Sequence, residues 1–302
     1  MPTRPSPLPP EIASGAFSVE EGREAGLSAR RLRAGDLDRS YWGVRSAGPA
    51  AGVRERCLLL QRRMPDHAFF SHTTAALLVG IPVPLAWEAD SVLHVAVKDP
   101  VRAPHARGLV GHRLRIEHGE ISRRGGIRLT TAARTWCDLA DMLTLPDLVA
   151  AGDHIIHWRQ PLATREQLEL AVTSRIGRRG LKVLRRALQM LSDRAESPPE
   201  SHLRVILLLA GFPEPRVNHT VTDRFGEFVG RTDLILDAEK IILEYQGDYH
   251  RPGKRQWRAD MTRRSRLEAL GWRVMELNAD DLKDPVELVA RIRAVAALPR
   301  AI

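Results

Sequence analysis

The chain has 302 residues, of which 43% are hydrophobic and 27% are charged, and these proportions are typical of a soluble globular protein. This length allows two or three domains, each with a core of its own. No apolar run approaches the roughly 18 residues that span a membrane, and the proline-rich start lacks the apolar stretch of a secretory signal. We therefore expect no membrane partner and a disordered lead-in over residues 1–14, and the presence of only two cysteines favours a reducing cytoplasm.

Positive charge dominates the chain. The formal net charge is +9 and the isoelectric point is near 10.3, and arginine supplies nearly all of the cations. Because the guanidinium group donates paired hydrogen bonds to phosphate, this balance favours a nucleic-acid partner. A GC-rich genome, which enriches arginine whatever the function, is the alternative. Cys57 and Cys137 stand singly in apolar surroundings, so we expect neither a disulfide framework nor a zinc knuckle.

The first ordered segment is predicted over residues 15–50. Ser18 and Glu21 have the spacing of a capping box, which marks the start of a helix. A second short helix is predicted in "SARRLRAG", residues 28–35, followed by a strand-like stretch. This order is typical of a winged helix-turn-helix, whose second helix enters the major groove of DNA. A small helical bundle with a solvated arginine face is the alternative. The candidate DNA-binding residues are Arg30, Arg31 and Arg33.

Residues 51–160 mix helical and strand-like patterns, which predicts a mixed α/β unit. Apolar residues have helical spacing in "CLLLQRRM", "HTTAALLVG" and "TAARTWCDLADML", whereas "SVLHVAVKD" alternates like a strand. The histidines of this stretch lack the i, i+4 spacing of a metal-binding pair on a helix, so we expect surface or hydrogen-bonded core residues. They are His67, His72, His94, His105, His112 and His118.

A basic helical connector is predicted over residues 161–195, and the last unit covers residues 196–302. The predicted elements of that unit are a helix at 199–210, strands within 215–246, a helix near 256–270, a strand at 272–277 and a helix at 285–297. We expect an α/β domain with a central mixed sheet.

The hairpin at residues 231–246 carries acids in its most apolar part. A turn centred on residues 238 and 239 places Asp233 opposite Glu244, where directly opposed Cβ atoms are about 4.5–5.5 Å apart. Because side chains alternate between the faces of a strand, Gln246 lies on the same face. Two bare carboxylates in an apolar sheet repel each other unless a proton or a cation neutralises them, and oxygen ligands suit Mg²⁺ or Mn²⁺. A solvated sheet end with two unrelated acids is the alternative.

Three blocks of the last unit carry a family resemblance. The blocks "SPPESHLRVILLLAG", "RTDLILDAEKIILEYQGDYHR" and "DMTRRSRLEALGWRVMEL" resemble the Vsr-like endonuclease domain of the PD-(D/E)XK nuclease superfamily, over about residues 196–300. The resemblance implies a restriction-endonuclease-like α/β core in which acids bind a divalent metal that activates water against a phosphodiester. It also implies that Asp233 and Glu244 are metal ligands and that Glu200 is a further ligand, directly or through water.

Two further residues bear on catalysis. The usual lysine of the fold, two residues after the glutamate, is replaced here by Gln246. Glutamine can orient the attacking water but cannot give a positive charge to the transition state. His250 also fits the family and could act as a general acid or base, since imidazole titrates near neutral pH. A structural hydrogen-bonding role is the alternative for His250.

The N-terminal part is similar to another family. The stretches "FSVEEGREAGLSARRLRAGDLDRSYWGV", "SHTTAALLVGIP" and "RLTTAARTWCDLA" resemble the AbiEi-type antitoxins, across residues 15–160. Such antitoxins have an N-terminal winged helix and repress their own operons, so the resemblance implies DNA binding. The usual "GVY" at the end of the wing is "GVR" here, which replaces an aromatic residue with a cation.

Two functions follow from these patterns. The first is a metal-dependent DNA endonuclease that its N-terminal part positions on double-stranded DNA, with Mg²⁺ or Mn²⁺ as cofactor. The second is a non-cutting DNA-binding regulator or antitoxin-like protein with a degenerate nuclease domain, for which a toxin or a repair protein is a further candidate partner. We favour the enzyme, because an unused scaffold has little reason to keep acids that destabilise it. RNA is an alternative substrate, since the same metal chemistry cuts either backbone.

Overall fold

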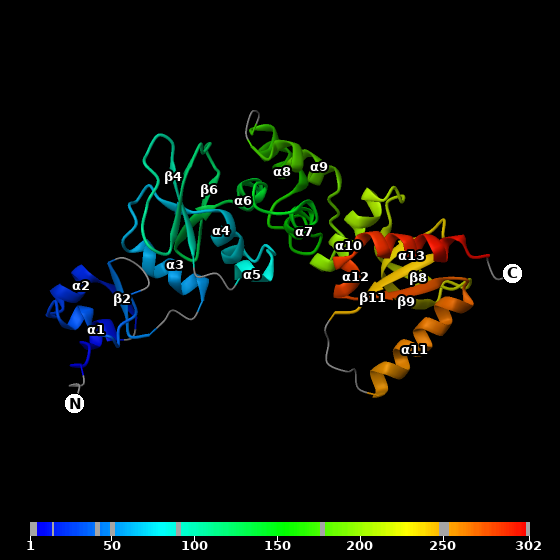
Figure 1. Cartoon of the computed structure of the whole chain (residues 1–302), viewed down its shortest axis with the longest axis horizontal. Coiled ribbons are helices and arrows are strands. Elements are labelled where there is room, and N and C mark those ends of the chain that lie inside the picture. The colour runs from blue at the N-terminus through cyan, green and yellow to red at the C-terminus, as the bar shows by residue number, and fades with distance from the viewer. Residues whose placement is uncertain are drawn as a thin grey trace. The chain divides into compact units, whose positions relative to one another are not determined.

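The chain folds as two units, Met1–Leu139 and Ala140–Ile302 (Figure 1). This computed structural model describes residues 5–13, 15–39, 43–48, 52–88, 92–175, 179–247 and 254–299, with side chains from residue 258 onward in the last range. The basic segment at 161–195, predicted as a connector, falls within the second unit. None of the helices in the described ranges is both long and apolar enough to cross a membrane.

The N-terminal segment folds around a short antiparallel strand pair. Its elements are α1 (Pro10–Ala13), β1 (Ala16–Ser18), α2 (Val19–Glu24), the 3₁₀ helix η1 (Arg31–Arg33) and β2 (Val44–Ser46), with β1 paired to β2. The predicted capping box at the start of α2 is confirmed. The Glu21 amide donates to Ser18 Oγ at 3.0 Å, and the Ser18 amide donates to the Glu21 carboxylate at 2.6 Å.

The second short helix predicted at residues 28–35 is a single 3₁₀ turn over Arg31–Arg33, which is shorter than predicted. Arg31 supplies the physical reason, because its guanidinium group donates to both oxygens of Asp36 at 2.9 and 2.8 Å and to the Ser6 carbonyl at 2.6 Å. These bonds turn the chain directly after η1. Arg31 is only 8% exposed, so its prediction as a DNA contact is also corrected. The winged helix-turn-helix stays a prediction. The arginines of this turn that remain exposed are Arg30 and Arg33.

The rest of the first unit is built on a mixed sheet in the order β5-β4-β3-β7-β6. Its strands are β3 (Phe69–Phe70), β4 (Leu93–Lys98), β5 (Leu109–Leu114), β6 (Ile121–Arg124) and β7 (Ile127–Thr130), and its helices are α3 (Val53–Gln61), α4 (His72–Val79), α5 (Leu85–Glu88) and α6 (Ala132–Leu139). The first five residues of β4 are buried, so this strand is covered on both faces. Cys57 and Cys137 are buried and do not form a disulfide with each other.

The second unit begins with three helices, α7 (Leu145–Ile155), α8 (Arg165–Thr173) and α9 (Leu181–Gln189). A four-stranded sheet follows in the order β11-β10-β9-β8, in which β10 and β11 are parallel and the other pairs antiparallel. Its elements are α10 (Pro198–Leu209), β8 (Arg216–Thr222), β9 (Phe228–Leu236), β10 (Ile241–Tyr245), α11 (Lys254–Ala269), β11 (Arg273–Leu277), α12 (Ala279–Lys283) and α13 (Pro285–Ala297). The mixed α/β architecture predicted for this part is confirmed.

Helices cover both faces of this sheet, as Figure 1 shows with α11 on one side and α13 on the other. Leu234 and Leu243 pack with residues of α10 and α13, whereas Ile235 and Ile242 pack with Leu267 of α11. The two cores follow from the period-two alternation of β9 and β10. The two acids of the hairpin therefore lie on the face toward α11.

A buried ion pair ties α7 to α10. Arg204 is 0% exposed, and it donates to Asp153 at 2.8 Å, while the Ser201 hydroxyl donates to the same carboxylate oxygen at 2.7 Å. Removing one partner of such a pair would leave an uncompensated buried charge, so the contact holds α10 in place.

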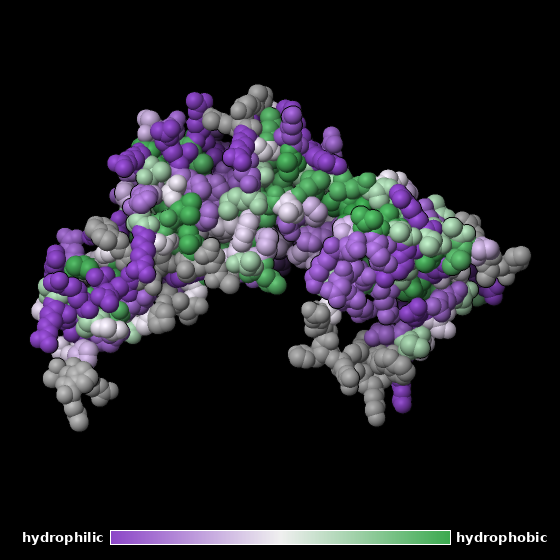
Figure 2. Space-filling view, viewed as in Figure 1, coloured by the Kyte–Doolittle hydropathy of each residue, from purple (hydrophilic) through white to green (hydrophobic). Residues whose placement is uncertain are grey.

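Figure 2 shows hydrophobic residues gathered over the α8–α10 part of the visible surface of this unit.

Candidate active site

The hairpin that carries the acids has the predicted register. In the antiparallel pair of β9 and β10, Leu234 lies opposite Leu243. Continuing this register by one residue places Asp233 opposite Glu244. The Tyr245 amide donates to the Asp233 carboxylate at 2.8 Å, so the side chain of Asp233 takes part in closing this end of the hairpin.

An arginine from α11 covers Glu244. The Glu244 side chain is 7% exposed, and its two oxygens accept from the Arg263 guanidinium group at 2.5 and 2.6 Å. The stem of Arg263 crosses Gly230, where a Cβ atom would lie 3.1 Å from the arginine Cγ and Cδ. A larger residue at position 230 would thus press on the arginine. A cation of the chain itself, Arg263, therefore neutralises one of the two carboxylates.

Glu200 comes from the first turn of α10 and is 8% exposed. Its carboxylate accepts from the Glu196 amide at 3.0 Å, the Ser197 hydroxyl at 2.7 Å and the Asn218 side-chain amide at 2.5 Å. These bonds join the start of α10 to β8. All three donors are neutral, so they orient the carboxylate without cancelling its charge.

Asp233 responds to the charges of both other acids. Its pKa is raised from 3.8 to about 6, first by burial and also by the charges of Glu200 and Glu244, against the lowering effects of the Tyr245 amide and of Arg263. Carboxylates from α10, β9 and β10 therefore act on one another. A divalent cation would neutralise this cluster, and a donor set made of oxygen alone suits Mg²⁺ or Mn²⁺. Among the described residues, however, Glu200, Asp233 and Glu244 do not form a group whose ligand atoms all lie within 4.8 Å of one another, so side-chain movements would have to bring them to one ion.

The other two predicted catalytic residues stand differently. Gln246 directly follows β10 and is exposed. Its backbone amide donates to the Leu277 carbonyl at 2.7 Å, and this bond continues the pairing with β11. Alternation along the strand places its side chain on the face of Glu244. His250 lies outside the described residues. The catalytic roles of both residues stay predictions.

An exposed aromatic residue is flanked by two arginines, one of which is linked to Glu200 through Asn218. Trp158 follows α7 and is 45% exposed, and the guanidinium groups of Arg159 and Arg194 lie 4.8 and 5.1 Å from its ring centroid. The Arg194 carbonyl accepts from the same Asn218 side chain that donates to Glu200. An exposed indole between two cations has the chemistry that stacks nucleic-acid bases and attracts phosphates.

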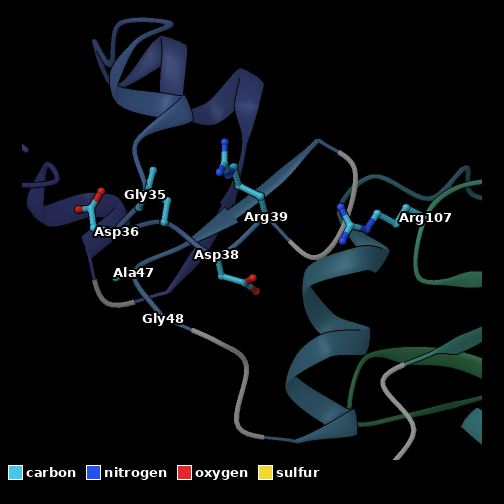
Figure 3. Close-up of a pocket in the computed structure, with 8 residues that line it drawn as sticks. Gly35, Asp36, Asp38, Arg39, Ala47, Gly48 and Arg107 are labelled. Carbon is cyan, nitrogen blue, oxygen red and sulfur yellow. The ribbon is translucent and has the colours of Figure 1, made fainter.

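The first unit contains a cavity of about 850 Å³ that is lined by none of the predicted catalytic acids. Figure 3 shows Asp36, Asp38, Arg39 and Arg107 among the residues around it. Because two acids and two arginines line the cavity, its walls select neither anions nor cations.

A second cavity of the first unit, of about 740 Å³, is lined by the arginines of the η1 turn. Arg30 and Arg33 are its exposed cations, and Arg33 donates to the Ala29 carbonyl at 3.1 Å. Two exposed guanidinium groups on one turn could contact DNA phosphates without a groove helix.

Sequence patterns missed two features of the described residues. Arg263 is one of several arginines on α11, and no local pattern marks it as the partner of Glu244. His72, His94 and His112 come from three elements, yet each offers a ring nitrogen within 4.8 Å of the others. No spacing along the chain links these histidines, since only the sheet and α4 bring them together.

No protein-family model matches the chain. It is 29% identical over 264 residues to two uncharacterized proteins of Mycobacterium tuberculosis, from strains CDC 1551 / Oshkosh and ATCC 25618 / H37Rv, and the alignment covers 87% of this chain and 93% of each relative. Because 264 residues exceed the length of either unit, this likeness extends over both. Among solved structures, the catalytic domain of the homing endonuclease I-Bth0305I is similar over 32% of this chain and 91% of that domain, with 23% sequence identity and a TM-score of 0.26.

Proposed function

We propose that the protein is a metal-dependent endonuclease that hydrolyses phosphodiester bonds in DNA, with Mg²⁺ or Mn²⁺ as cofactor. One observation carries the proposal: Asp233 of β9 has a pKa raised to about 6, first by burial and also by the charges of Glu200 at the start of α10 and Glu244 on β10. Such a cluster opposes folding, and a bound divalent cation removes that cost. A cluster of acids that a cation completes is the usual basis of metal-assisted phosphodiester hydrolysis.

The three acids would divide the work of binding the ion. Asp233 and Glu244 would hold it, and Glu200 would bind it directly or through water. The bound ion would lower the pKa of a water molecule and neutralise charge on the phosphate. Glu244 would release Arg263, and the guanidinium group would then remain beside the cluster, where it favours an approaching phosphate.

Two residues beyond the acids would complete the reaction. Gln246 would orient the attacking water through its side-chain amide. His250 would exchange a proton with that water or with the leaving oxygen. Since glutamine replaces the usual lysine, Arg263, which pairs with Glu244, would supply the missing positive charge to the transition state.

Two surfaces would hold the nucleic acid. In the second unit, Trp158 with Arg159 and Arg194 would stack a base and contact phosphates next to Glu200. In the first unit, Arg30 and Arg33 would contribute phosphate contacts, which strengthen binding without reading sequence.

A plasmid-cleavage assay with the full chain tests the proposal. Supercoiled plasmid should be nicked or linearised with Mg²⁺ or Mn²⁺ and not with EDTA. Asp233→Ala should lose this activity, whereas Asp237→Ala, an exposed acid in the turn of the same hairpin, should retain it. Equal cleavage by wild type and Asp233→Ala would show that the acids do not form the site.

The ion pair between Glu244 and Arg263 favours a second candidate, a non-cutting DNA-binding regulator. In such a protein the arginine would permanently replace the metal ion, and the absent lysine would not matter. This protein would bind duplex DNA equally well with Mg²⁺ and with EDTA, and it would cut neither DNA nor RNA. Metal-dependent cutting of RNA but not of DNA would keep the site and change the substrate.

A further inference from the structure

Three histidines converge in the first unit, and the proposed nuclease reaction uses none of them. His72 begins α4, His94 lies on β4 and His112 lies on β5. In the parallel pairing of β4 and β5, residue 94 is opposite 110 and residue 96 is opposite 112. His94 and His112 are therefore diagonal neighbours on one face of the sheet, and the start of α4 brings His72 to them.

The rings lie at distances close to those of a metal site. His94 Nδ1 and His112 Nε2 are 2.9 Å apart, and the rings of His72 and His112 stack with centroids 3.8 Å apart. One nitrogen of each ring lies within 4.8 Å of the others. In a tetrahedral site with metal–nitrogen bonds of about 2.0–2.1 Å, the ligand nitrogens are about 3.4 Å apart. Small side-chain movements would therefore bring the three nitrogens to one ion.

The surroundings hold the cluster in place. His72 and His94 are 8% and 9% exposed, whereas His112 is partly exposed, so an ion has access from one side. The Ser71 hydroxyl lies 2.9 Å from His72 Nδ1, and this contact orients the ring. Thr74 Oγ1 accepts from the His94 amide at 2.7 Å and so fixes the strand to α4.

The backbone at His72 supports a function for this arrangement. Its φ is +50°, in the left-handed region that residues other than glycine rarely adopt. Such a conformation costs free energy and is found mainly where the surrounding structure requires a particular side-chain direction. Here it directs the imidazole of the first helical residue toward β4 and β5.

We propose that His72, His94 and His112 bind a transition-metal ion of the zinc class through three imidazole nitrogens, with a water or an external ligand in the fourth position. Imidazole suits Zn²⁺, Cu²⁺, Ni²⁺ and Fe²⁺ better than Mg²⁺, so this site differs in chemistry from the carboxylate cluster. The ion would fasten β5, the strand at the end of the sheet order, to β4 and α4. Its effect would thus be on the stability of the first unit.

Calorimetric titration of the metal-free full chain with ZnCl₂ tests the proposal. Wild type should bind one Zn²⁺ at this site, and Zn²⁺ should raise its melting temperature. His112→Gln and His94→Gln should weaken this binding by at least about 100-fold, since each removes a ligand. His118→Gln, an exposed histidine of the same unit, should bind like wild type. Asp233→Ala should also keep the site, which separates this result from the nuclease proposal.

A gain of signal protects the test against variants that fold poorly. Co²⁺ bound to His112→Cys should show a thiolate-to-metal charge-transfer band that Co²⁺-bound wild type lacks, because thiolate ligates directly. Circular dichroism checks that the variant is folded. The proposal is overturned if wild type binds no Zn²⁺, if His112→Gln binds it as tightly as wild type, or if folded His112→Cys lacks the band.

Discussion

At Asp233 a carboxylate is held where burial and two neighbouring acids oppose its ionisation. Its pKa is raised from 3.8 to about 6, so between these pH values the folded protein holds a proton that the unfolded chain releases. The metal-free protein should therefore lose stability as pH rises through this window, by on the order of 3 kcal/mol in total. Above the folded pKa the loss is complete and stability no longer depends on this group.

Asp233→Asn should remove that pH dependence. The asparagine side chain keeps the shape of the aspartate, and its oxygen can still accept from the Tyr245 backbone amide. It does not ionise, so burial and the neighbouring acids impose no cost on it. Urea unfolding between pH 4 and pH 7 should show metal-free Asp233→Asn at least as stable as wild type at pH 7. The stabilisation by Mg²⁺, about 2.7 kcal/mol for wild type at a hundredfold excess over Kd, should disappear.

Asp237→Asn is the matched control, because this exposed aspartate lies in the turn of the same hairpin. It should keep both the pH dependence and the response to Mg²⁺. If Asp233→Asn instead destabilises the metal-free protein and leaves the Mg²⁺ response intact, Asp233 is a structural hydrogen-bond acceptor.

Arg263 is the counter-ion of Glu244 within the chain, and its removal should make the protein less stable without a metal ion. In Arg263→Gln the buried Glu244 loses its bidentate partner, so the metal-free protein should lose about 1–3 kcal/mol. Mg²⁺ should restore most of this loss, and its effect on the melting temperature should exceed that in wild type. Thermal unfolding with and without Mg²⁺ measures both quantities. Arg266→Gln, an exposed arginine on the same helix, should change neither.

Among the elements, the predicted helix at residues 28–35 differs clearly from the η1 turn that the structure has there. The sequence predicts this basic segment as a helix that enters the DNA groove, but it forms one 3₁₀ turn. Arg31, the second of its three arginines, is buried and pairs with Asp36. The arginines of this turn therefore divide into two kinds. Arg31 holds the turn together, while Arg30 and Arg33 remain exposed to a partner.

This division predicts different outcomes for substitutions at neighbouring arginines of the turn. Arg30→Ala with Arg33→Ala should leave the melting temperature unchanged and weaken duplex binding, with the slope of log K against log salt reduced by about 0.9 for each lost phosphate contact. Arg31→Ala should instead lower the melting temperature, because it leaves Asp36 without its bidentate partner. Binding measured from 50 to 300 mM salt tests this, and an unchanged slope in the folded double variant would exclude Arg30 and Arg33 from the DNA contact.

For the whole molecule, the two proposed metal sites have different ligands in different units. The carboxylates lie in the second unit and suit Mg²⁺ or Mn²⁺, whereas the histidines lie in the first unit and suit Zn²⁺. The two ions should therefore stabilise separate parts of one chain.

Hydrogen exchange on the full chain, read by mass spectrometry, should resolve these effects. Zn²⁺ should slow exchange in α4, β4 and β5, and Mg²⁺ should slow it in β9 and β10, because each ion binds only where its folded ligands are. Asp233→Asn should abolish the Mg²⁺ effect alone, and His112→Gln the Zn²⁺ effect alone. Protection by Mg²⁺ in the first unit, or its persistence in Asp233→Asn, would contradict the assignment of the carboxylate site.

Local patterns in the sequence determined most of the second unit. The alternation of β9 and β10 and the polar turn between them set the hairpin register, in which Leu234 lies opposite Leu243 and the next position pairs Asp233 with Glu244. The capping box at Ser18 and Glu21 likewise follows from residues three apart. Such features depend on near neighbours in the chain, so sequence periodicity and spacing predict them.

Only the tertiary structure decided which cations and histidines meet. Arg263 pairs with Glu244, 19 residues earlier in the chain. Arg31 is buried, whereas Arg30 and Arg33 are exposed, although all three side chains have the same chemistry. The cluster of His72, His94 and His112 needs two strands and a helix to assemble. The physical reason is the same in each case. The packing of segments that are distant in the sequence decides which side chains come into contact, and no local spacing of residues encodes that packing.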